Sequence, residues 1–579
     1  GVRRSHQASQ AFADGEERCG VGMMFYIPAQ VWCEEQLARE RYADALVTDP
    51  QAKTYFSTPW VTGHDNELLV YPYGTSFGEQ TRKDLTEVAA ELHLSGFAFD
   101  TAGGVARYTG PALPRLAGRA WDPTLGVYCS ELVAIAHVMD FVHTLRHDGR
   151  ALAVVANPMA NGSYASCFRC DSAMLERNPW QHSRTEADRL RWKLGHKTMV
   201  WWEGYEVADF VDQATVTPEQ LARVYEGLAD FTLLQSLRVG AIPTPNFTQG
   251  VARLVRWLPV IVDCVEAGWE PVTAVRVSEP AWASRYGRGL QTRVAMAHET
   301  GQPVSVEAVV ENARLGSGAL LFTRHDGALV RNRVVGGETV VPVDLAVRSP
   351  VVLRSALEVR PAAAVTAAEV ALHEGIAQAR LEARLSGRGD AVVRVRIPVG
   401  MVPTAASCDG QPGRLTVSGE SAEISLSLSA PSVVTVDFAS DLFRVADDDL
   451  LGFPFAVDRR PAGVIAVPPA ATPGVRQAAF RLQEYFRYWY GRAERPVGSF
   501  LIPVQEQAGT GPTVLVRTVP ESKPAVRREG TTLIVEAPTD AALGASMDRL
   551  LRALDRRYWT CDEFGQAAVR ERLAAYGRD

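Results

Sequence analysis

Short apolar runs alternate with amphipathic segments through the first half of the chain. Three of these runs end in an acidic residue, at 96–100 (GFAFD), 172–176 (SAMLE) and 198–203 (TMVWWE), and a fourth, 151–156, is followed by Asn157. Runs of this length between helical segments are typical of buried parallel strands. In a (β/α) barrel the carboxyl ends of such strands form the active site, so we expect these polar residues to meet there.

The number of strands predicts a barrel that lacks its beginning. An amphipathic helix is expected over 81–92, and the segment 218–237 also has a helical pattern, although 231–234 could instead be a strand. An eight-stranded barrel then needs one or two strands before Gly1, so we expect the chain to be a fragment with an exposed strand edge. The strand candidates are centred on Met23, Leu69, Phe97, Val154, Met174 and Val200, that near Leu69 being the weakest.

The pattern changes near residue 268, where short segments of alternating polarity begin. Such segments fill 272–359 and 376–438 and are typical of antiparallel sheets, whereas 441–579 mixes strands with two long helices. The sequence therefore predicts a multidomain protein. Its predicted parts are an N-terminally incomplete (β/α)8-type barrel (1–270), a β-sandwich (271–360), a second β-module (361–440) and a small α/β accessory domain (441–579).

Composition excludes some classes of protein but does not identify the function. Hydrophobic residues make up 46% and charged residues 22% of the chain, as in ordinary globular proteins. A net charge of −7 argues against a nucleic-acid partner. No apolar run approaches the length of a membrane span, and no signal peptide opens the chain. If a secretory signal precedes Gly1, the protein is secreted or periplasmic.

Other kinds of catalytic or cofactor site find little support. The sequence has no G-x-S-x-G elbow and no glycine-rich fingerprint that opens a helix. Cys167-x-x-Cys170 is one pair without a second pair at zinc spacing, so two small buried residues are the favoured interpretation. We therefore expect no metal and no cofactor.

Two carboxylates across a barrel mouth are the minimal equipment for hydrolysing a glycosidic bond. One carboxylate attacks or stabilises the oxocarbenium-like state, and one carboxylic acid protonates the leaving oxygen. Asp100 and Glu176 are the first candidates and Glu203 is the third, because each ends a predicted strand. Each could instead cap the next helix or pair with an arginine.

The order of these residues resembles that of a known enzyme family. Asp100 in GFAFD, then Asn157, then 171–176 (DSAMLE) followed by Trp180, is similar to the order in dextranase-type family 66 glycoside hydrolases. The resemblance implies that Asp100 is the nucleophile and Glu176 the acid/base of a retaining enzyme. The loops after both acids depart from the family pattern, so the substrate does not transfer.

Two later segments carry resemblances of their own. Residues 257–271 resemble the last barrel helix and the exit into a β-sandwich in such enzymes. Residues 478–559 look like the non-catalytic α/β domain beside the barrel in family 20 hexosaminidases and family 67 glucuronidases.

Aromatic and polar residues on the predicted mouth loops are suited to bind sugar rings. Aromatic rings pack well against the apolar faces of sugars. We expect a carbohydrate substrate, no nucleic acid and no membrane, with an unknown oligomeric state. The predicted substrate-binding residues are Trp60, His64, Asp65, Trp121, Asn157, Trp180, Trp202 and Tyr205.

Two other functions stay open at this point. The first is a non-catalytic carbohydrate-binding or scaffold protein, which predicts only one well-placed acid. The second is a polysaccharide lyase, which needs a base and a cation partner that His64, Arg107 and Tyr108 could supply. The sequence names neither the sugar nor its linkage.

Overall fold

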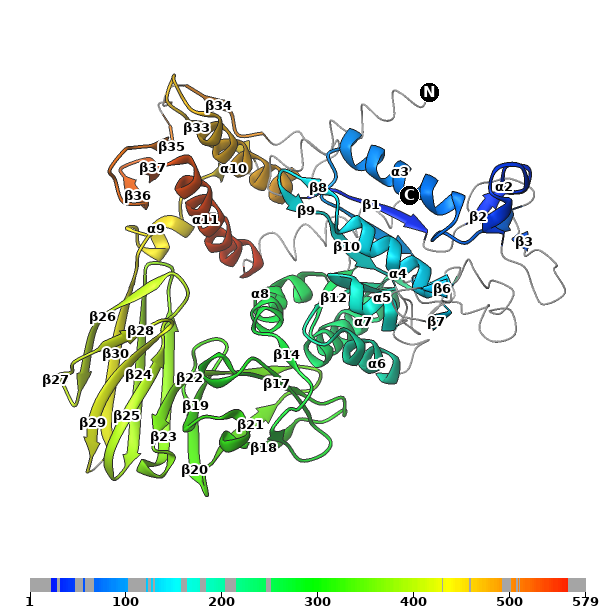
Figure 1. Ribbon diagram of the computed structural model, residues 1–579. Helices are drawn as coiled ribbons and strands as arrows, with labels where there is room; N and C mark the ends of the chain where they lie inside the picture. Colours follow the sequence, from blue (N-terminus) through cyan, green and yellow to red (C-terminus); the bar gives the residue numbers. More distant parts are fainter. Residues whose placement is uncertain are drawn as a thin grey trace. The chain divides into compact units, whose positions relative to one another are not determined.

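The structure is a computed structural model of the 579-residue chain (Figure 1). The chain separates into two units, a first unit of Gly1–Phe210 with Ala241–Asn246 and a second unit of Val211–Gly240 with Phe247–Asp579. The residues described are 22–28, 32–46, 56–57, 67–100, 102, 121–122, 127–128, 131–157, 164–176, 184–203, 215–245, 251–429, 431–457, 460–491, 501–506, 509 and 511–560.

A parallel sheet forms the centre of the first unit, and every pairing along it is parallel. Four of its strands confirm the predicted apolar runs at 96–100, 151–156, 172–176 and 198–203. Closure of this sheet into a barrel stays a prediction. In spatial order its described strands are β1 (Met24–Pro28), β5 (Gly96–Asp100), β10 (Ala153–Ala156), β11 (Ser172–Glu176), β12 (Thr198–Glu203) and β13 (Ala241–Pro245).

Alternate residues of these strands are buried, as expected where helices cover one face of a sheet. Phe97 and Phe99 of β5 and Val154 and Ala156 of β10 are almost fully buried, whereas Ala98 between them is partly exposed. Helix α6 contacts β11 and β12, and both α4 and α5 contact β10. The described helices of this unit are α2 (Glu35–Arg41), α3 (Ser76–Glu91), α4 (Glu131–Val142), α5 (Tyr164–Arg169) and α6 (Arg184–Leu194).

Two candidates for barrel strands do not belong to the parallel sheet. The candidate near Leu69 belongs to β4 (Glu67–Leu69), which pairs antiparallel with β2 (Trp32–Glu34) and β3 (Phe56–Ser57) in a separate small sheet. Residues 231–234 lie inside the long helix α7 (Pro218–Val239). Two short hairpins complete the first unit, β6 (Trp121–Asp122) with β7 (Val127–Tyr128) and β8 (Arg146–His147) with β9 (Arg150–Ala151).

The sixth parallel strand, β13, was missed because two of its five residues are proline. Proline removes a donor from the ladder and is tolerated mainly on edge strands. β13 lies at the end of the described sheet order, where only β12 pairs with it. Pro243 and Pro245 therefore fit an edge that the hydrophobic pattern alone does not identify.

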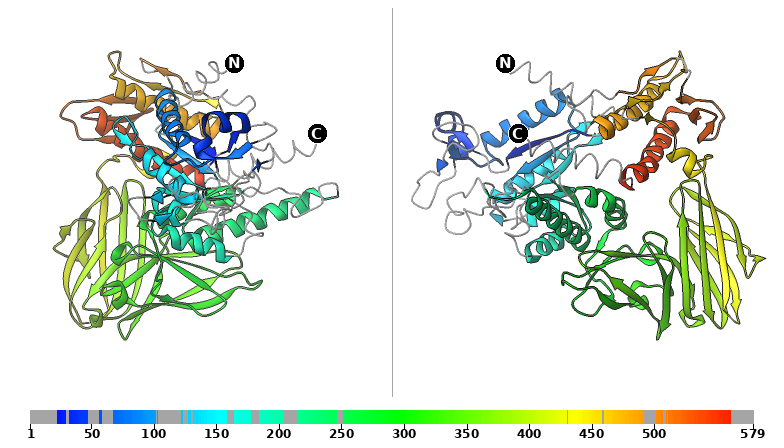
Figure 2. Two further views of the ribbon diagram at one scale, coloured as in Figure 1. Left: turned by 45° about the vertical axis from the view of Figure 1, so that its right-hand side comes forward. Right: turned by 180° about the vertical axis from the view of Figure 1, so that it is seen from behind.

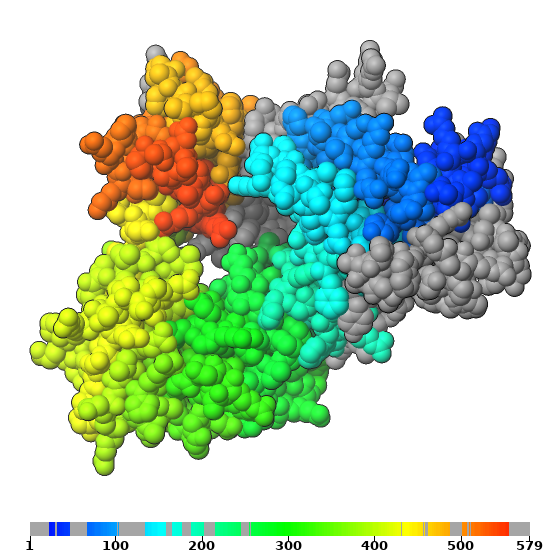
Figure 3. Space-filling view, in the orientation of Figure 1, coloured from blue at the N-terminus to red at the C-terminus, as the bar shows by residue number. Residues whose placement is uncertain are grey.

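Two antiparallel sheets follow helix α8 (Val251–Ala267) in the second unit and form one continuous body, green to yellow in Figure 3. The first sheet contains β14 (Trp269–Glu270), β16 (Trp282–Tyr286), β17 (Arg293–Ala297), β22 (Val351–Arg360), β25 (Gly389–Arg396), β29 (Ser421–Leu428) and β28 (Thr416–Ser418), with β19 (Ala319–Arg324) beside β22. The second contains β15 (Val275–Arg276), β18 (Val304–Val310), β21 (Glu338–Leu345), β20 (Val330–Val335), β23 (Val365–Glu374), β24 (Gln378–Gly387), β30 (Ser432–Ser440), β26 (Met401–Cys408) and β27 (Gln411–Pro412).

Each sheet contains strands from both sides of residue 360, where the sequence predicts a domain boundary. Strand β22 pairs with β25, and β20 pairs with β23. The buried side chains still form two clusters, one that contains Phe322 and another that contains Phe438. The division into two β-modules stays a prediction.

The segment that follows Ser440 combines strands with two long helices, as its pattern predicts. Helices α10 (Pro473–Gly491) and α11 (Asp540–Thr560) pack against each other, as both views of Figure 2 show. Helix α9 (Asp447–Leu451) and the hairpin β31 (Ala456–Val457) with β32 (Arg460–Pro461) precede the domain's sheet. In spatial order that sheet holds β34 (Val504–Gln505), β33 (Val464–Ala466), β35 (Thr513–Thr518), β37 (Thr532–Ala537) and β36 (Ala525–Glu529).

No helix in the described part of the chain has the length and apolar character needed to span a membrane.

Candidate active site

Asp100 is held by side chains from two neighbouring strands at the carboxyl end of the parallel sheet. The Tyr26 hydroxyl donates to Asp100 Oδ1 at 2.7 Å, and the Asn157 side-chain amide donates to the same oxygen at 2.9 Å. The Asn157 amide also donates to the Tyr26 oxygen at 3.0 Å. Hydrogen bonds to a charged acceptor are stronger than neutral ones, so these contacts fix the orientation of the carboxylate.

Backbone hydrogen bonds also join the two strands at this edge of the sheet. The Asn157 amide nitrogen donates to the Phe99 carbonyl at 2.7 Å, and Ala102 donates to the Asn157 carbonyl at 2.8 Å. Asn157 is buried, whereas Asp100 is partly exposed. A buried amide that contacts a partly exposed carboxylate leaves the acid within reach of a ligand.

Gly96 allows the two central strands to approach each other. A Cβ atom at this position would lie 2.3 Å from the Ala153 carbonyl oxygen of β10. Phe97 and Phe99 bury their side chains on the covered face, so alternation places Asp100 on the other face with Ala98. The GFAFD run thus sets both the spacing of the strands and the direction of the acid.

The strand register fixes where the other predicted acids fall along the sheet. Phe99, Ala156, Ala173 and Met199 lie in one row across four strands. Counted from this row, Asp100 is one residue beyond it, and the backbone positions 176 and 203 are three and four residues beyond it.

Of the predicted site residues, the structure brings Asp100 and Asn157 together. It describes the backbone but not the side chains of Glu176, Trp202 and Glu203, and the same holds for Trp121 in β6. The remaining predicted positions, Trp60, His64, Asp65, Trp180 and Tyr205, lie outside the described residues.

Tyr26 was not among the predicted site residues. The sequence predicts a strand at 22–27, but its neighbours in the sheet are not evident from the pattern. Its register with β5 pairs Tyr26 with Ala98, two residues before Asp100 on the same face of the sheet. Only the knowledge that β1 and β5 are neighbours could have identified this contact.

Cys167 and Cys170 are buried free thiols. Burial raises the pKa of Cys167 to about 11 and that of Cys170 to about 12, so both thiols are protonated at neutral pH. Cys170 donates to the Cys167 carbonyl at 3.6 Å. Within the described ranges, no group of three His, Cys, Asp or Glu side chains is arranged to hold a metal ion.

No family model and no curated protein matches the sequence. The chain resembles several solved structures of glycoside hydrolases at very low identity. A noncanonic maltogenic α-amylase from Thermotoga neapolitana is 11% identical over 60% of this chain and 80% of the amylase, with a TM-score of 0.36. A GH31 dextranase from Flavobacterium johnsoniae, complexed with glucose, is 8% identical over 75% of this chain and 64% of the dextranase, with a TM-score of 0.38.

An α-L-fucosidase from Paenibacillus thiaminolyticus is 10% identical over 73% of this chain and 88% of the fucosidase, with a TM-score of 0.27. Since all these TM-scores lie below 0.5, the likenesses carry no argument about the reaction or the substrate. The chain is similar to glycoside hydrolases at this coarse level, and membership of a particular family is not shown.

Proposed function

We propose that this protein is a glycoside hydrolase that cleaves O-glycosidic bonds of a poly- or oligosaccharide with two carboxylates. The observation that supports the proposal most is the position of Asp100. It ends a parallel strand, is partly exposed, and accepts hydrogen bonds from Tyr26 and Asn157 on the two flanking strands. A carboxylate fixed at the carboxyl end of a strand fits the role of the nucleophile in a barrel glycosidase.

Glu176 is the proposed partner of Asp100. Side chains alternate along a strand, so positions one and three residues beyond a common row are expected on the same face of the sheet, and position 203 on the opposite face. With one strand between them and a two-residue offset, the Cα atoms of Asp100 and Glu176 should be about 12 Å apart. Two side chains that point toward each other can then bring their carboxyl groups within the range of a retaining enzyme, about 5–5.5 Å.

In the proposed reaction Asp100 attacks the anomeric carbon while Glu176 protonates the leaving oxygen. The resulting glycosyl ester on Asp100 is then hydrolysed by a water molecule that Glu176 deprotonates. Tyr26 and Asn157 hold the attacking carboxylate in one orientation, which preserves its alignment between turnovers. If Glu203 serves in place of Glu176, the same two half-reactions apply with that residue as the acid.

A panel of aryl glycosides that differ in sugar and anomer tests the proposal. The wild-type chain should hydrolyse at least one of them. Asp100→Asn and Glu176→Gln should each lower the rate by about 10²–10⁴-fold or more while circular dichroism stays unchanged. Glu203→Gln is the matched control and should stay active.

Three outcomes separate the alternatives. Loss of activity in Glu203→Gln but not in Glu176→Gln would transfer the acid role to Glu203. Sugar binding without hydrolysis by the wild type would favour the non-catalytic binding protein. Unsaturated sugar products would favour the lyase.

A further inference from the structure

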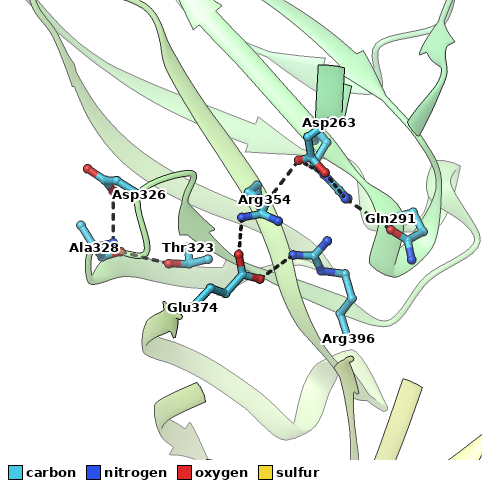
Figure 4. Close-up of polar contacts among 9 residues, drawn as sticks. Asp263, Gln291, Thr323, Asp326, Ala328, Arg354, Glu374 and Arg396 are labelled. Carbon is cyan, nitrogen blue, oxygen red and sulfur yellow. Dashed lines mark hydrogen bonds and ion pairs between the residues drawn. The ribbon is translucent and has the colours of Figure 1, made fainter. Parts of the chain in front are cut away.

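Three arginines meet on one face of the first sheet of the β-region, beside helix α8 (Figure 4). Arg293 of β17 lies directly opposite Arg354 of β22 in the antiparallel register, and Arg396 is on the next strand, β25. Like charges placed directly opposite each other repel, so such a set needs negative charge nearby. We call Arg293, Arg354, Arg396, Asp263 and Glu374 the arginine cluster.

Two carboxylates neutralise part of the positive charge of the three arginines. Asp263 on α8 accepts hydrogen bonds from Arg293 at 2.8 and 3.1 Å and lies 3.3 Å from Arg354 Nε. Glu374, the last residue of β23, accepts from Arg354 at 2.9 Å and from Arg396 at 3.4 Å. Three guanidinium groups against two carboxylates leave the arginine cluster with one excess positive charge.

The excess charge is buried. The Arg293 and Arg396 side chains are only 4% and 3% exposed, and the Arg354 side chain is 16% exposed. Among the described residues, Cys264 and His325 do not supply the missing negative charge. Burial raises the pKa of the Cys264 thiol far above neutrality and lowers the pKa of the His325 ring, so both are neutral. An unneutralised charge in such a place is costly, so a structure normally provides a partner for it.

The arginine cluster also has donors without acceptors. Arg293 Nη1 and Arg396 Nε are buried and make no hydrogen bond to any described residue, and Arg354 Nε has its 3.3 Å ion pair with Asp263. A guanidinium group carries five N–H donors. Among the described residues, the Arg396 side chain donates one hydrogen bond, to Glu374 at 3.4 Å. Arg293 and Arg396 therefore have donors left over on the same sheet face that carries the excess charge.

We propose that the arginine cluster binds one monovalent inorganic anion, chloride in an ordinary buffer. A single negative charge balances the excess, and a small halide can accept several N–H donors at once without needing the planar geometry of a carboxylate. The pKa of Arg396, which burial and the charges of Arg354 and Arg293 lower to about 9, reflects the same crowding of positive charge. Asp263 is 31% exposed, so one side of the arginine cluster is in contact with solvent.

Thermal unfolding of the full chain in chloride and in gluconate at constant ionic strength tests this site. Ligand binding to the folded state raises the unfolding temperature, so chloride at about ten times its Kd should raise it by about 1–2 °C in wild type, while gluconate should not. Arg396→Met should lose this response because the remaining charges balance. Arg394→Met should keep it, since Arg394 lies on the same strand but bonds Glu358 instead, at 3.1 Å.

A direct probe of the ion covers the case in which Arg396→Met fails to fold. Crystals of the wild-type protein grown in bromide should show an anomalous peak within hydrogen-bond distance of Arg396 and at least one other arginine of the cluster. A water molecule there, with equal unfolding temperatures in chloride and gluconate, would overturn the proposal. An unfolding response to chloride that persists fully in Arg396→Met would do the same.

Discussion

At the scale of single residues, the Tyr26 hydroxyl is the contact whose loss should most affect Asp100 without removing the acid itself. Tyr26→Phe removes the 2.7 Å hydrogen bond to Asp100 Oδ1 and leaves the ring in place. A hydrogen bond to a charged group contributes about 1.5–3 kcal/mol, so we expect kcat/KM to fall about 10- to 100-fold while the protein stays folded at the assay temperature.

Tyr42→Phe is the control for this measurement, because Tyr42 packs edge-on against Phe77 and not against Asp100. Steady-state kinetics on an aryl glycoside that the wild type cleaves gives both values. If Tyr26→Phe and Tyr42→Phe were equally active, Tyr26 would have no part in positioning Asp100.

A second residue-scale prediction concerns the acid stability of the arginine cluster. Burial acts to raise the pKa of Asp263, but hydrogen bonds from Arg293 and the charges of Arg354 and Arg396 outweigh burial and lower this pKa to about 2. A carboxylate whose pKa is lowered by folding stabilises the folded state above its ordinary pKa and loses that effect as the pH falls. The contribution of Asp263 is about 2 kcal/mol near pH 7 and should vanish between about pH 4 and pH 2.

Urea unfolding of Asp263→Asn and wild type from pH 7 to pH 2 measures this directly. The difference in unfolding free energy should be constant above pH 4 and shrink below it. Asp344→Asn serves as the surface control, because Asp344 is exposed and bonds Ser305. A difference between Asp263→Asn and wild type that does not change with pH would contradict the assignment.

At the scale of elements, Lys197 joins the short helix α5 to the segment that enters β12. Its ammonium group donates to the carbonyl oxygens of Cys167, Phe168 and Cys170 at 2.9, 2.6 and 2.7 Å. These carbonyls belong to the end of α5, where helical partners are lacking. Lys197→Met should therefore lower the unfolding free energy by about 2 kcal/mol.

Lys83→Met is the matched control, because Lys83 makes only an exposed 3.9 Å pair with Glu87. Chemical denaturation of both variants gives the comparison. Equal stability of Lys197→Met and Lys83→Met would show that the carbonyls at the end of α5 need no charged partner.

The elements that the sequence predicted well are those whose burial follows a simple period. The strands ending at Asp100 and Glu176 were found because each is a short apolar run between helical segments, a pattern typical of parallel strands. β13 was missed because its two prolines are untypical of a strand. Leu69 was assigned to the wrong sheet because a run of three apolar residues does not determine which strands it pairs with.

The candidate site was predictable only in part, for a related reason. Asp100 ends one predicted parallel strand and Asn157 follows the next predicted one. Their contact could therefore be expected from the sequence. Tyr26 reaches Asp100 across a separation of 74 residues, and the arginine cluster joins α8 to strands that pair far along the chain. Contacts of this kind depend on strand order, which local periodicity does not contain.

At the scale of the whole molecule, the last domain is expected to stabilise the chain rather than to take part in the chemistry. Its Asp447 carboxylate accepts hydrogen bonds from the backbone amides of Ile376 and Ala377, and Ile376 is buried in the core of that domain. Deleting 441–579 should lower the unfolding temperature and solubility by exposing apolar surface, while the rate of hydrolysis stays close to that of the full chain.

Asp447→Ala is a milder variant, which should lower stability without exposing the whole domain core. Activity assays and calorimetry on the deletion and on Asp447→Ala separate the two effects. A deletion variant that is soluble and folded but inactive would mean that the last domain contributes to the active site.

The claim that Asp100 is the nucleophile of a retaining glycosidase is tested most directly by trapping its glycosyl ester. A 2-deoxy-2-fluoro glycoside of the sugar that the wild type cleaves slows both steps. A good leaving group keeps the first step faster than the second, so the intermediate accumulates. Mass spectrometry of the digested protein should find one glycosyl unit on the peptide that contains Asp100. A label on another carboxylate, or no label in an active enzyme that the reagent inactivates, would contradict the account.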